Sequence, residues 1–154
     1  MEQPEITTHE LTTLDPNDVL DLEKLMPFLS PRFKDVPIPT TRLQEIISSP
    51  SHEQFVARCD GRIIGAATMS IVMGAAMGKE GYLSDFVVHP EARGTGASQA
   101  LWGNIVLWST VHKLDVIRFT SHQSREAAHR FYEKQGATIV DTTVFEVATR
   151  EFTI

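Results

Sequence analysis

The sequence predicts an α/β fold in which a mixed, mostly antiparallel sheet carries helices on its faces. Three observations predict it. Asp60-Gly61 stands between two apolar runs, which is a strong signal for a β-hairpin. Strand-like and helix-like segments then alternate from Tyr82 to Gln135, as in a strand–helix–strand crossover. The helical segment Ala97–His112 has a broad apolar face, so we expect it to be substantially buried.

The predicted elements follow in order as one strand, two helices, three strands, a helix, a strand, a helix and two strands. Strands are expected at Ile6–Thr12, Gln54–Arg58, Arg62–Ile71, Tyr82–Val88, Val116–Thr120, Ala137–Thr142 and Val144–Thr149. Helices are expected through Val19–Met26 and at Thr41–Ser48, Ala97–His112 and Ser124–Gln135. The sheet would then have roughly six to seven strands, with about four helices around it.

Prolines and glycines mark the expected connections. Asn17 or Asp18 is the expected cap of the first helix. Pro27 is expected to end that helix, and a proline-rich loop should follow it. The segment Gly74–Gly81 is rich in glycine and methionine, and we interpret it as a connection between strands.

Length and composition suit one globular domain over residues 1–154, with 42% apolar residues. The single cysteine, Cys59, allows no intramolecular disulfide, which suits a reducing cytoplasm. A net charge of −6 without a basic cluster argues against a nucleic-acid partner and would attract a cationic amine. Met1–Glu10 has no apolar run of the kind found in signal peptides, and no segment has the apolar length of a membrane-spanning helix.

The segment His89–Ser98 joins a predicted strand to a long helix. Gly94 and Gly96 allow the backbone to turn tightly and to approach a ligand closely. The start of the helix would supply unpaired N–H groups to phosphate oxygens, and Arg93 could add charge-assisted hydrogen bonds to a pyrophosphate. The alternative is an ordinary turn between a strand and a helix.

Two common phosphate-binding motifs do not fit this loop. A dinucleotide fingerprint needs a third glycine where Gln99 stands, and an acid after the next strand, whereas Asp115 precedes that strand. A nucleotide P-loop needs a lysine followed by serine or threonine after its last glycine, and these are absent. The loop chemistry therefore points to another phosphate-bearing ligand.

Two stretches resemble the GNAT N-acetyltransferase superfamily. Phe86–Ala97 resembles its acetyl-CoA motif, in which Arg or Gln, two residues, Gly, one residue and Gly or Ala follow each other; Arg93 and Gly96 match, and Ser98 occupies the last position. Ala128–Gly136 resembles a later helix of the superfamily, which normally ends Gly-Phe, with Ala137 in place of the Phe. The resemblance covers Tyr82–Ala137 and implies a GNAT-like acyl-CoA N-acyltransferase fold, with acetyl-CoA as co-substrate.

The resemblance also implies which residues act. The coenzyme would be held by Phe86, Val87, Val88, Arg93, Gly94, Thr95, Gly96, Ala97, Ser98, Arg125 and Tyr132. In the family, the tyrosine that matches Tyr132 points its hydroxyl at the coenzyme sulfur, so Tyr132 is the expected acid for the departing thiolate. A backbone N–H near Val88 is the expected donor to the oxyanion.

The base that takes the proton of the amine is less sharply defined. An alkylammonium has a pKa of about 10 and must lose a proton before it attacks. Asp85 is the only carboxylate in the predicted strand Tyr82–Val88, where alternation groups it with Leu83 and Val87. Glu80 is the fallback, although its position suggests a surface charge, and a water relay is a further alternative.

Three functions stay open at this point. The first is acetylation of a primary amine on a small molecule, the second acetylation of a protein lysine or N-terminus, and the third a non-catalytic acetyl-CoA-binding regulatory module. A closed apolar pocket around Phe28, Phe33 and Met73 would indicate a small amine, and an open groove a peptide. Metal is not expected, because no Cys/His/Asp cluster has ligand spacing. A homodimer is possible through the final strands, Ala137–Thr149.

Overall fold

The computed structural model describes residues 2–151 of the chain. The chain divides into two compact units, of which the first ends at Thr120 and the second begins at Ser121. The first unit holds the whole sheet and three helices, and the second holds one further helix and the C-terminal residues. That the two units form a single domain stays a prediction.

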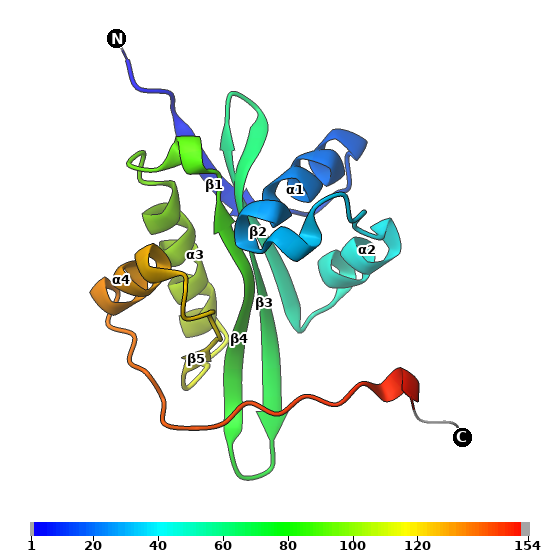
Figure 1. Cartoon of the computed structure of the whole chain (residues 1–154), viewed down its shortest axis with the longest axis vertical. Coiled ribbons are helices and arrows are strands. Elements are labelled where there is room, and N and C mark those ends of the chain that lie inside the picture. Colours follow the sequence, from blue (N-terminus) through cyan, green and yellow to red (C-terminus); the bar gives the residue numbers. More distant parts are fainter. Residues whose placement is uncertain (1, 152–154) are drawn as a thin grey trace. The chain divides into compact units, whose positions relative to one another are not determined.

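The sheet of the first unit has five strands in chain order, β1 (Ile6–Glu10), β2 (His52–Cys59), β3 (Arg62–Gly74), β4 (Gly78–Val88) and β5 (Ile117–Arg118). The first four strands are antiparallel to their neighbours, and β5 is parallel to β4 (Figure 1). The hairpin expected at Asp60-Gly61 is confirmed as the β2–β3 turn. The mixed, mostly antiparallel sheet is therefore as predicted.

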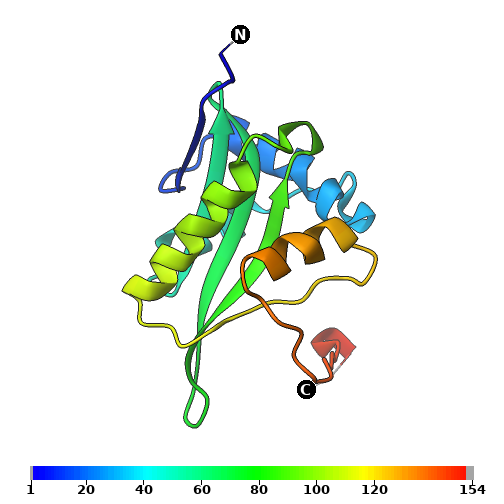
Figure 2. The same ribbon diagram turned by 90° about the vertical axis from the view of Figure 1, so that its left-hand side faces the viewer.

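Helices cover both faces of this sheet. Helix α1 (Pro16–Leu29) and helix α2 (Thr40–Ser48) lie on one face, and helix α3 (Ala97–Val111) lies on the other (Figures 1 and 2). Phe55 of β2 packs edge-on against Trp108 of α3, with 6.4 Å between ring centroids. The next residue, Val56, belongs to the core beneath α1 and α2. Neighbouring residues of a strand point to opposite faces, so the apolar run of β2 serves two cores.

Helix α1 has a well-defined start and end. The Asp15 carboxylate caps it by accepting the Asn17 N–H at 2.7 Å, and Pro16 occupies its first turn. The expectation that the helix ends at Pro27 is wrong, because the helix continues to Leu29. Pro27 lies in the last turn, where its missing N–H removes a single helical bond and Ser30 still donates to Met26.

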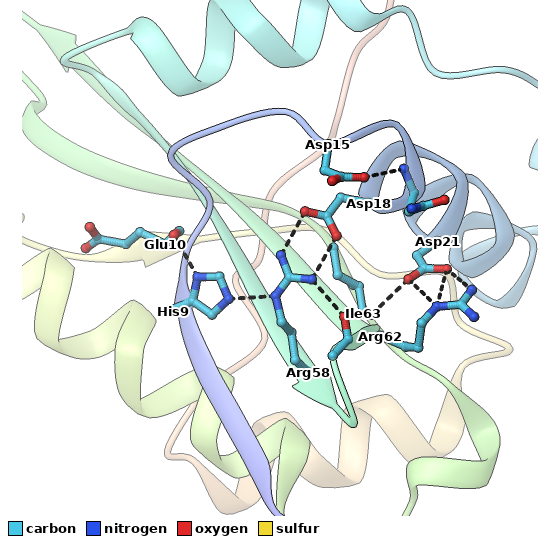
Figure 3. Close-up of polar contacts among 10 residues, drawn as sticks. His9, Glu10, Asp15, Asp18, Asp21, Arg58, Arg62 and Ile63 are labelled. Atoms are coloured by element: carbon cyan, nitrogen blue, oxygen red, sulfur yellow. Dashed lines mark hydrogen bonds and ion pairs between the residues drawn. The ribbon is translucent and has the colours of Figure 1, made fainter.

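Two ion pairs hold α1 against the β2–β3 hairpin (Figure 3). The Arg58 guanidinium donates to both carboxylate oxygens of Asp18, at 2.7 and 2.8 Å. The buried Asp21 carboxylate accepts from the Arg62 guanidinium and from the Ile63 N–H, the latter at 3.1 Å. Because both arginines belong to the hairpin and both acids to one helix, these contacts fix how α1 crosses the strands.

The β3–β4 hairpin is longer than the sequence suggested. The segment Gly74–Gly81 is mostly strand, because β3 runs to Gly74 and β4 begins at Gly78. Their ladder extends to the pair Gly74–Gly78, so the connection is only residues 75–77. Figure 1 shows this hairpin extending beyond the other strands. The alternation of apolar residues becomes weaker toward the tip of the hairpin, but the backbone pairing of β3 with β4 continues there.

The second unit contains helix α4 (Glu126–Lys134) and a short 3-10 turn at Thr149–Glu151. The two closing strands expected at Ala137–Thr142 and Val144–Thr149 are not formed, and β5 is shorter than Val116–Thr120. The Thr142 N–H donates to the Val140 carbonyl, a local turn that interrupts extended pairing. The sheet therefore has five strands rather than six or seven, since a strand-like sequence forms a strand only with a partner.

Candidate functional site

The loop between β4 and α3 takes the turn that its glycines predicted. A 3-10 turn at Pro90–Ala92 leads into Arg93, and then Gly94 and Gly96 adopt left-handed φ values of +77° and +87°. Residues with a Cβ rarely adopt this conformation. A Cβ built on either glycine meets no atom within 4 Å, so the loop presents bare backbone to open space.

Unpaired N–H groups converge on this loop. Within residues 2–151, the N–H groups of Gly94, Gly96 and Ser98 have no hydrogen-bond partner. The Ala97 N–H is held by the Thr95 hydroxyl at 3.4 Å, and that hydroxyl donates in turn to the Ala92 carbonyl. These donors lie at the positive end of the α3 dipole, which is a favourable place for phosphate oxygens.

Arg93 adds positive charge to the loop. Its side chain is exposed, and the structure gives it no ion pair. An unpaired guanidinium beside a row of N–H donors fits a diphosphate, whose oxygens can accept from both. The loop therefore has a geometry that suits phosphate, and its role as the coenzyme site stays a prediction.

Strand β4 contains a β-bulge just before this loop. Ala66 pairs with Val87, whereas Thr68 pairs with Ser84, so two residues of β4, Asp85 and Phe86, face one residue of β3. Asp85 adopts a left-handed φ of +54°, which aspartate tolerates better than most residues. The bulge shifts the alternation by one residue.

That shift overturns the expected grouping of Asp85 with Leu83 and Val87 on one face. After the bulge, Val87 packs into the core beneath α1, while Phe86 contacts Trp102 of α3. A bulge adds one residue to a strand without changing its apolar character, so the sequence pattern did not reveal it.

The backbone of β4 presents donors on the edge that faces away from β3. The His89 N–H donates to the Ile64 carbonyl at 2.7 Å. Successive N–H groups of a strand point to opposite edges, so the Val88 N–H points away from β3. On that side, β5 pairs with β4 only at Gly81 and Tyr82. On that edge, none of the described strands pairs with β4 at Val88.

Three aromatic rings lie on the α3 side of the sheet, next to the part of β4 that does not pair with β5. Phe86 of β4 meets Trp102 of α3 edge-on with centroids 6.2 Å apart, and Trp102 meets Phe119 beyond β5 at 6.0 Å. Sequence reasoning included Phe86 but missed Trp102 and Phe119. The i, i+3 and i, i+4 spacing of α3 marked a buried face, but it did not tell which side chain would bridge the two strands.

Two acids of β4 were candidate bases, and the structure separates them. Glu80 is buried and forms an ion pair with Arg118 of β5 at 2.6 Å, so its interpretation as a surface charge is wrong. Asp85 is exposed to solvent, yet the protein around its carboxyl group desolvates it partly and raises its pKa. The positive charge of Arg32 opposes this rise in the Asp85 pKa.

Phe28, Phe33 and Met73, which could have enclosed a small amine, do not surround one pocket in the described structure. Met73 is 71% exposed near the tip of the β3–β4 hairpin, and Phe28 is 48% exposed. Phe28 stacks edge-on with His89 at 4.8 Å, and Phe33 lies beneath the Arg32 guanidinium at 4.7 Å. Phe28 thus lies beyond the end of β4 and Met73 lies opposite Lys79 near its start, so these side chains do not line one cavity.

The second unit carries the remaining predicted residues. Tyr132 of α4 is buried, and desolvation raises the pKa of its hydroxyl. A hydrogen bond from Arg125 and the charge of Arg125 oppose this rise in pKa. Arg125 was predicted as a coenzyme ligand. In the structure it interacts with Tyr132, which follows it in α4. The roles of both residues stay predictions.

Two further properties concern metal binding and membrane spanning. Within residues 2–151, no group of three or more His, Cys, Asp or Glu side chains is placed to hold a metal ion. None of the helices in that range is both long and apolar enough to span a membrane.

Comparison with known sequences decides the family. The sequence model of the Acetyltransferase (GNAT) family matches residues 19–137. The chain belongs to the GNAT acetyltransferase family. The match spans the glycine loop and helix α4, which are the two stretches that carried the resemblance. The protein is accordingly an acetyltransferase.

Individual GNAT relatives agree with this assignment. An uncharacterized N-acetyltransferase of Mycobacterium bovis is 30% identical over 125 residues, which cover 75% of this chain and 71% of the relative. An aminoglycoside acetyltransferase from an uncultured soil metagenomic sample has a similar fold, with a TM-score of 0.78 at 18% identity over 94% of this chain and 95% of that one. An acetyltransferase of Trypanosoma brucei gives a TM-score of 0.74 at 20% identity, covering 94% and 100% of the two chains. The GNAT-like fold predicted from the sequence is confirmed.

Proposed function

We propose that this GNAT enzyme transfers the acetyl group of acetyl-CoA directly to a primary amine of a small molecule. The observation that carries the proposal is the β4–α3 loop. Its unpaired N–H groups at Gly94, Gly96 and Ser98 lie beside the exposed Arg93. Such a loop fits the diphosphate of the coenzyme.

The open edge of β4 suits the thioester end of the same molecule. The Val88 N–H is directed to that edge, where a donor would stabilise the negative charge that develops on the thioester oxygen. The bulge at Asp85 and Phe86 lies two to three residues away in the same strand. Phosphate recognition and thioester polarisation would thus come from one continuous stretch of backbone.

Proton transfer is assigned to two side chains. The amine attacks the thioester carbon, a C–N bond forms and the C–S bond breaks. Tyr132 would donate its hydroxyl proton to the departing thiolate, and Asp85 would take the proton that the amine loses, directly or through water. A raised pKa makes the Asp85 carboxylate a stronger proton acceptor than an ordinary aspartate.

A small polar amine is the proposed acceptor. The net charge of −6 attracts cations, and the proteins of similar fold include an aminoglycoside acetyltransferase whose structure was solved in complex with sisomicin.

A second candidate acceptor is a lysine-bearing peptide. A peptide needs a surface that is accessible from more than one side, and the exposed Phe28 beside His89 leaves such access. A direct comparison of acceptors separates the two.

The test is release of coenzyme A thiol from acetyl-CoA in the presence of polyamines, aminosugars, amino acids and lysine peptides. The proposal expects at least one small amine to raise thiol release well above the rate with water alone. Saturable turnover of peptides only would favour the second candidate. If no acceptor in the panel raised thiol release above the rate with water alone, both candidates would be contradicted.

A further inference from the structure

A pocket lies between α1, the start of β3 and the turn that follows β4. Its volume is about 490 Å³, within the range of roughly 300–1,000 Å³ that is usual for small-molecule pockets. All of its lining residues precede Ser121, so it belongs to the first unit alone. Thr95 of the glycine loop is among them, whereas Gly94, Gly96 and Ser98 are not. The pocket and the unpaired N–H groups proposed to hold phosphate are therefore separate features of the loop.

The apolar part of this lining is aliphatic. It consists of Pro4, Ile6, Leu25, Ile63, Ile64 and Ala92. Leu25 and Ile63 are almost fully buried and also belong to the core beneath α1. Such a lining suits a branched alkyl chain, because burying that chain removes apolar surface from water.

Four charged side chains also line the pocket, and two of them neutralise each other. The Arg62 guanidinium donates to the buried Asp21 carboxylate through Nε and Nη2 (Figure 3). The other two are Lys24 of α1 and Glu91 of the turn after β4. Within residues 2–151, neither of these two side chains has an ion pair or a hydrogen bond. The pocket thus offers one unpaired cation and one unpaired anion, each from a different element.

Two further donors lie around the pocket besides Lys24. Arg62 uses Nε and Nη2 for Asp21, which leaves Nη1 without a partner among the described residues. The Glu91 N–H donates to His89 Nδ1 at 3.1 Å, so a neutral His89 ring carries its proton on Nε2. No hydrogen bond in the described part of the chain uses that Nε2–H. Three free donors fit the two oxygens of a carboxylate, and the Glu91 carboxylate fits an ammonium group.

We propose that this pocket binds a free α-amino acid with a branched aliphatic side chain. The carboxylate of the amino acid pairs with Lys24, its ammonium group pairs with Glu91, and its alkyl group contacts the aliphatic lining. A simple carboxylic acid would place a second negative charge beside Glu91, and a simple amine would leave Lys24 unpaired. Only the zwitterion complements both charges. This inference does not depend on the acetyl acceptor.

The first measurement is calorimetric titration of the full chain with leucine in the absence of acetyl-CoA. Two analogues serve as controls, namely 4-methylpentanoate, which lacks the ammonium group, and 3-methylbutylamine, which lacks the carboxylate. Leucine should bind with a Kd on the order of 1 mM or lower. Each analogue should bind at least about tenfold more weakly, because it loses one charge-assisted contact. Absence of leucine binding would overturn the proposal, and so would an analogue that binds as tightly as leucine.

The position of bound leucine can be measured at Cys59, which lines the pocket and is the single cysteine of the chain. Its side chain is partly exposed, so iodoacetamide can reach it. Leucine should slow the alkylation of Cys59, with half of the effect at the leucine concentration that equals its calorimetric Kd. An alkylation rate that stays unchanged at saturating leucine would place the amino acid elsewhere and overturn the proposal.

Matched variants test the two charged contacts. Lys24→Gln and Glu91→Gln should each weaken leucine binding at least about tenfold while the thermal unfolding of the protein stays unchanged. Lys34→Gln and Glu45→Gln remove the same charges at exposed positions outside the pocket and should keep the wild-type affinity. Wild-type affinity in either pocket variant would contradict the proposed contact, and equal weakening in the control variants would reduce the effect to net charge.

A last titration separates this inference from the proposed coenzyme site, on which this arm rests. Saturating acetyl-CoA should leave leucine binding in place, because Gly94, Gly96 and Ser98 do not line the pocket. Loss of leucine binding would show that the two ligands compete and would overturn the separate site. If acetyl-CoA itself failed to bind, the proposed function would fail, whereas the titration without coenzyme would still decide whether the pocket binds leucine.

Discussion

The His89 N–H donates to the Ile64 carbonyl at 2.7 Å, and this bond fixes the direction of the neighbouring Val88 N–H. Because N–H groups alternate along a strand, the Val88 donor faces the edge that β5 leaves uncovered beyond Tyr82. The proposed oxyanion donor depends on backbone register and not on any one side chain. Point mutations of Val88 should therefore reveal little, and the informative substitutions lie elsewhere.

Tyr132→Phe should lower kcat by about 100-fold while the Kd for acetyl-CoA changes less than about threefold, since the hydroxyl is proposed to act in proton transfer. Stopped-flow or steady-state thiol release gives kcat, and calorimetry gives the Kd. Tyr82 is the other tyrosine of the chain and supplies the control, so Tyr82→Phe should leave kcat unchanged. Equal turnover in Tyr132→Phe and wild type would remove the acid role.

Asp85→Asn should remove or flatten the acidic limb of the pH profile of kcat/KM. In the wild type that limb reports deprotonation of the base, and the raised pKa of Asp85 places it above the range of an ordinary aspartate. Asp60→Asn is a suitable control, because Asp60 also has a left-handed φ, of +49°, but lies in the β2–β3 turn. A wild-type profile in Asp85→Asn would show that another group or water takes the proton.

Arg32→Gln should shift the same limb to higher pH. The positive charge of Arg32 favours the ionised Asp85 and holds its pKa down, so its removal lets that pKa rise further. Lys34→Gln, two residues away, removes an equal charge and should leave the profile in place. A shift to lower pH in Arg32→Gln would contradict this electrostatic account.

Asp21→Asn should lower the free energy of unfolding by about 1–3 kcal/mol at pH 7, the usual cost of disrupting buried hydrogen bonds to a charged group. Arg62 lowers the pKa of Asp21, so the ionised carboxylate stabilises the fold fully above the ordinary pKa of 3.8. That stabilisation is lost as the pH falls through the lowered pKa of the folded state.

Urea unfolding at pH 7 and pH 3 measures this difference. The gap between wild type and Asp21→Asn should narrow at pH 3. Asp15→Asn on the same helix is the control, because asparagine caps a helix about as well as aspartate. A gap that widens toward pH 3 would be incompatible with a lowered Asp21 pKa.

The sequence predicted most of the first unit correctly. The Asp60-Gly61 hairpin, the buried helix α3 and the glycine loop all follow from local rules on turns, periodicity and left-handed glycine. The family followed from two motifs with their order and separation. Each of these features is encoded within a few consecutive residues, which is why sequence alone sufficed.

The features that were missed depend on pairing between distant segments. The bulge at Asp85 exists because β3 and β4 match with one extra residue, and the buried state of Glu80 depends on Arg118 in another strand. Residues 137–148 have the pattern of a strand but form none in the described chain. Strand propensity alone could not predict whether these residues form a strand, because a strand is stabilised by the segment that pairs with it.

If the glycine loop binds acetyl-CoA, an acidic side chain within it should prevent binding, and calorimetric titration of Gly96→Glu measures this. Gly96 has a left-handed φ of +87° and faces open space, so a glutamate there would strain the loop and repel the diphosphate. Gly103→Glu, on an exposed turn of α3 with the same open surroundings, is the matched control. Wild type and Gly103→Glu should bind acetyl-CoA alike, whereas Gly96→Glu should lose affinity by at least about 100-fold with its thermal unfolding unchanged. A folded Gly96→Glu variant with wild-type affinity would contradict the site.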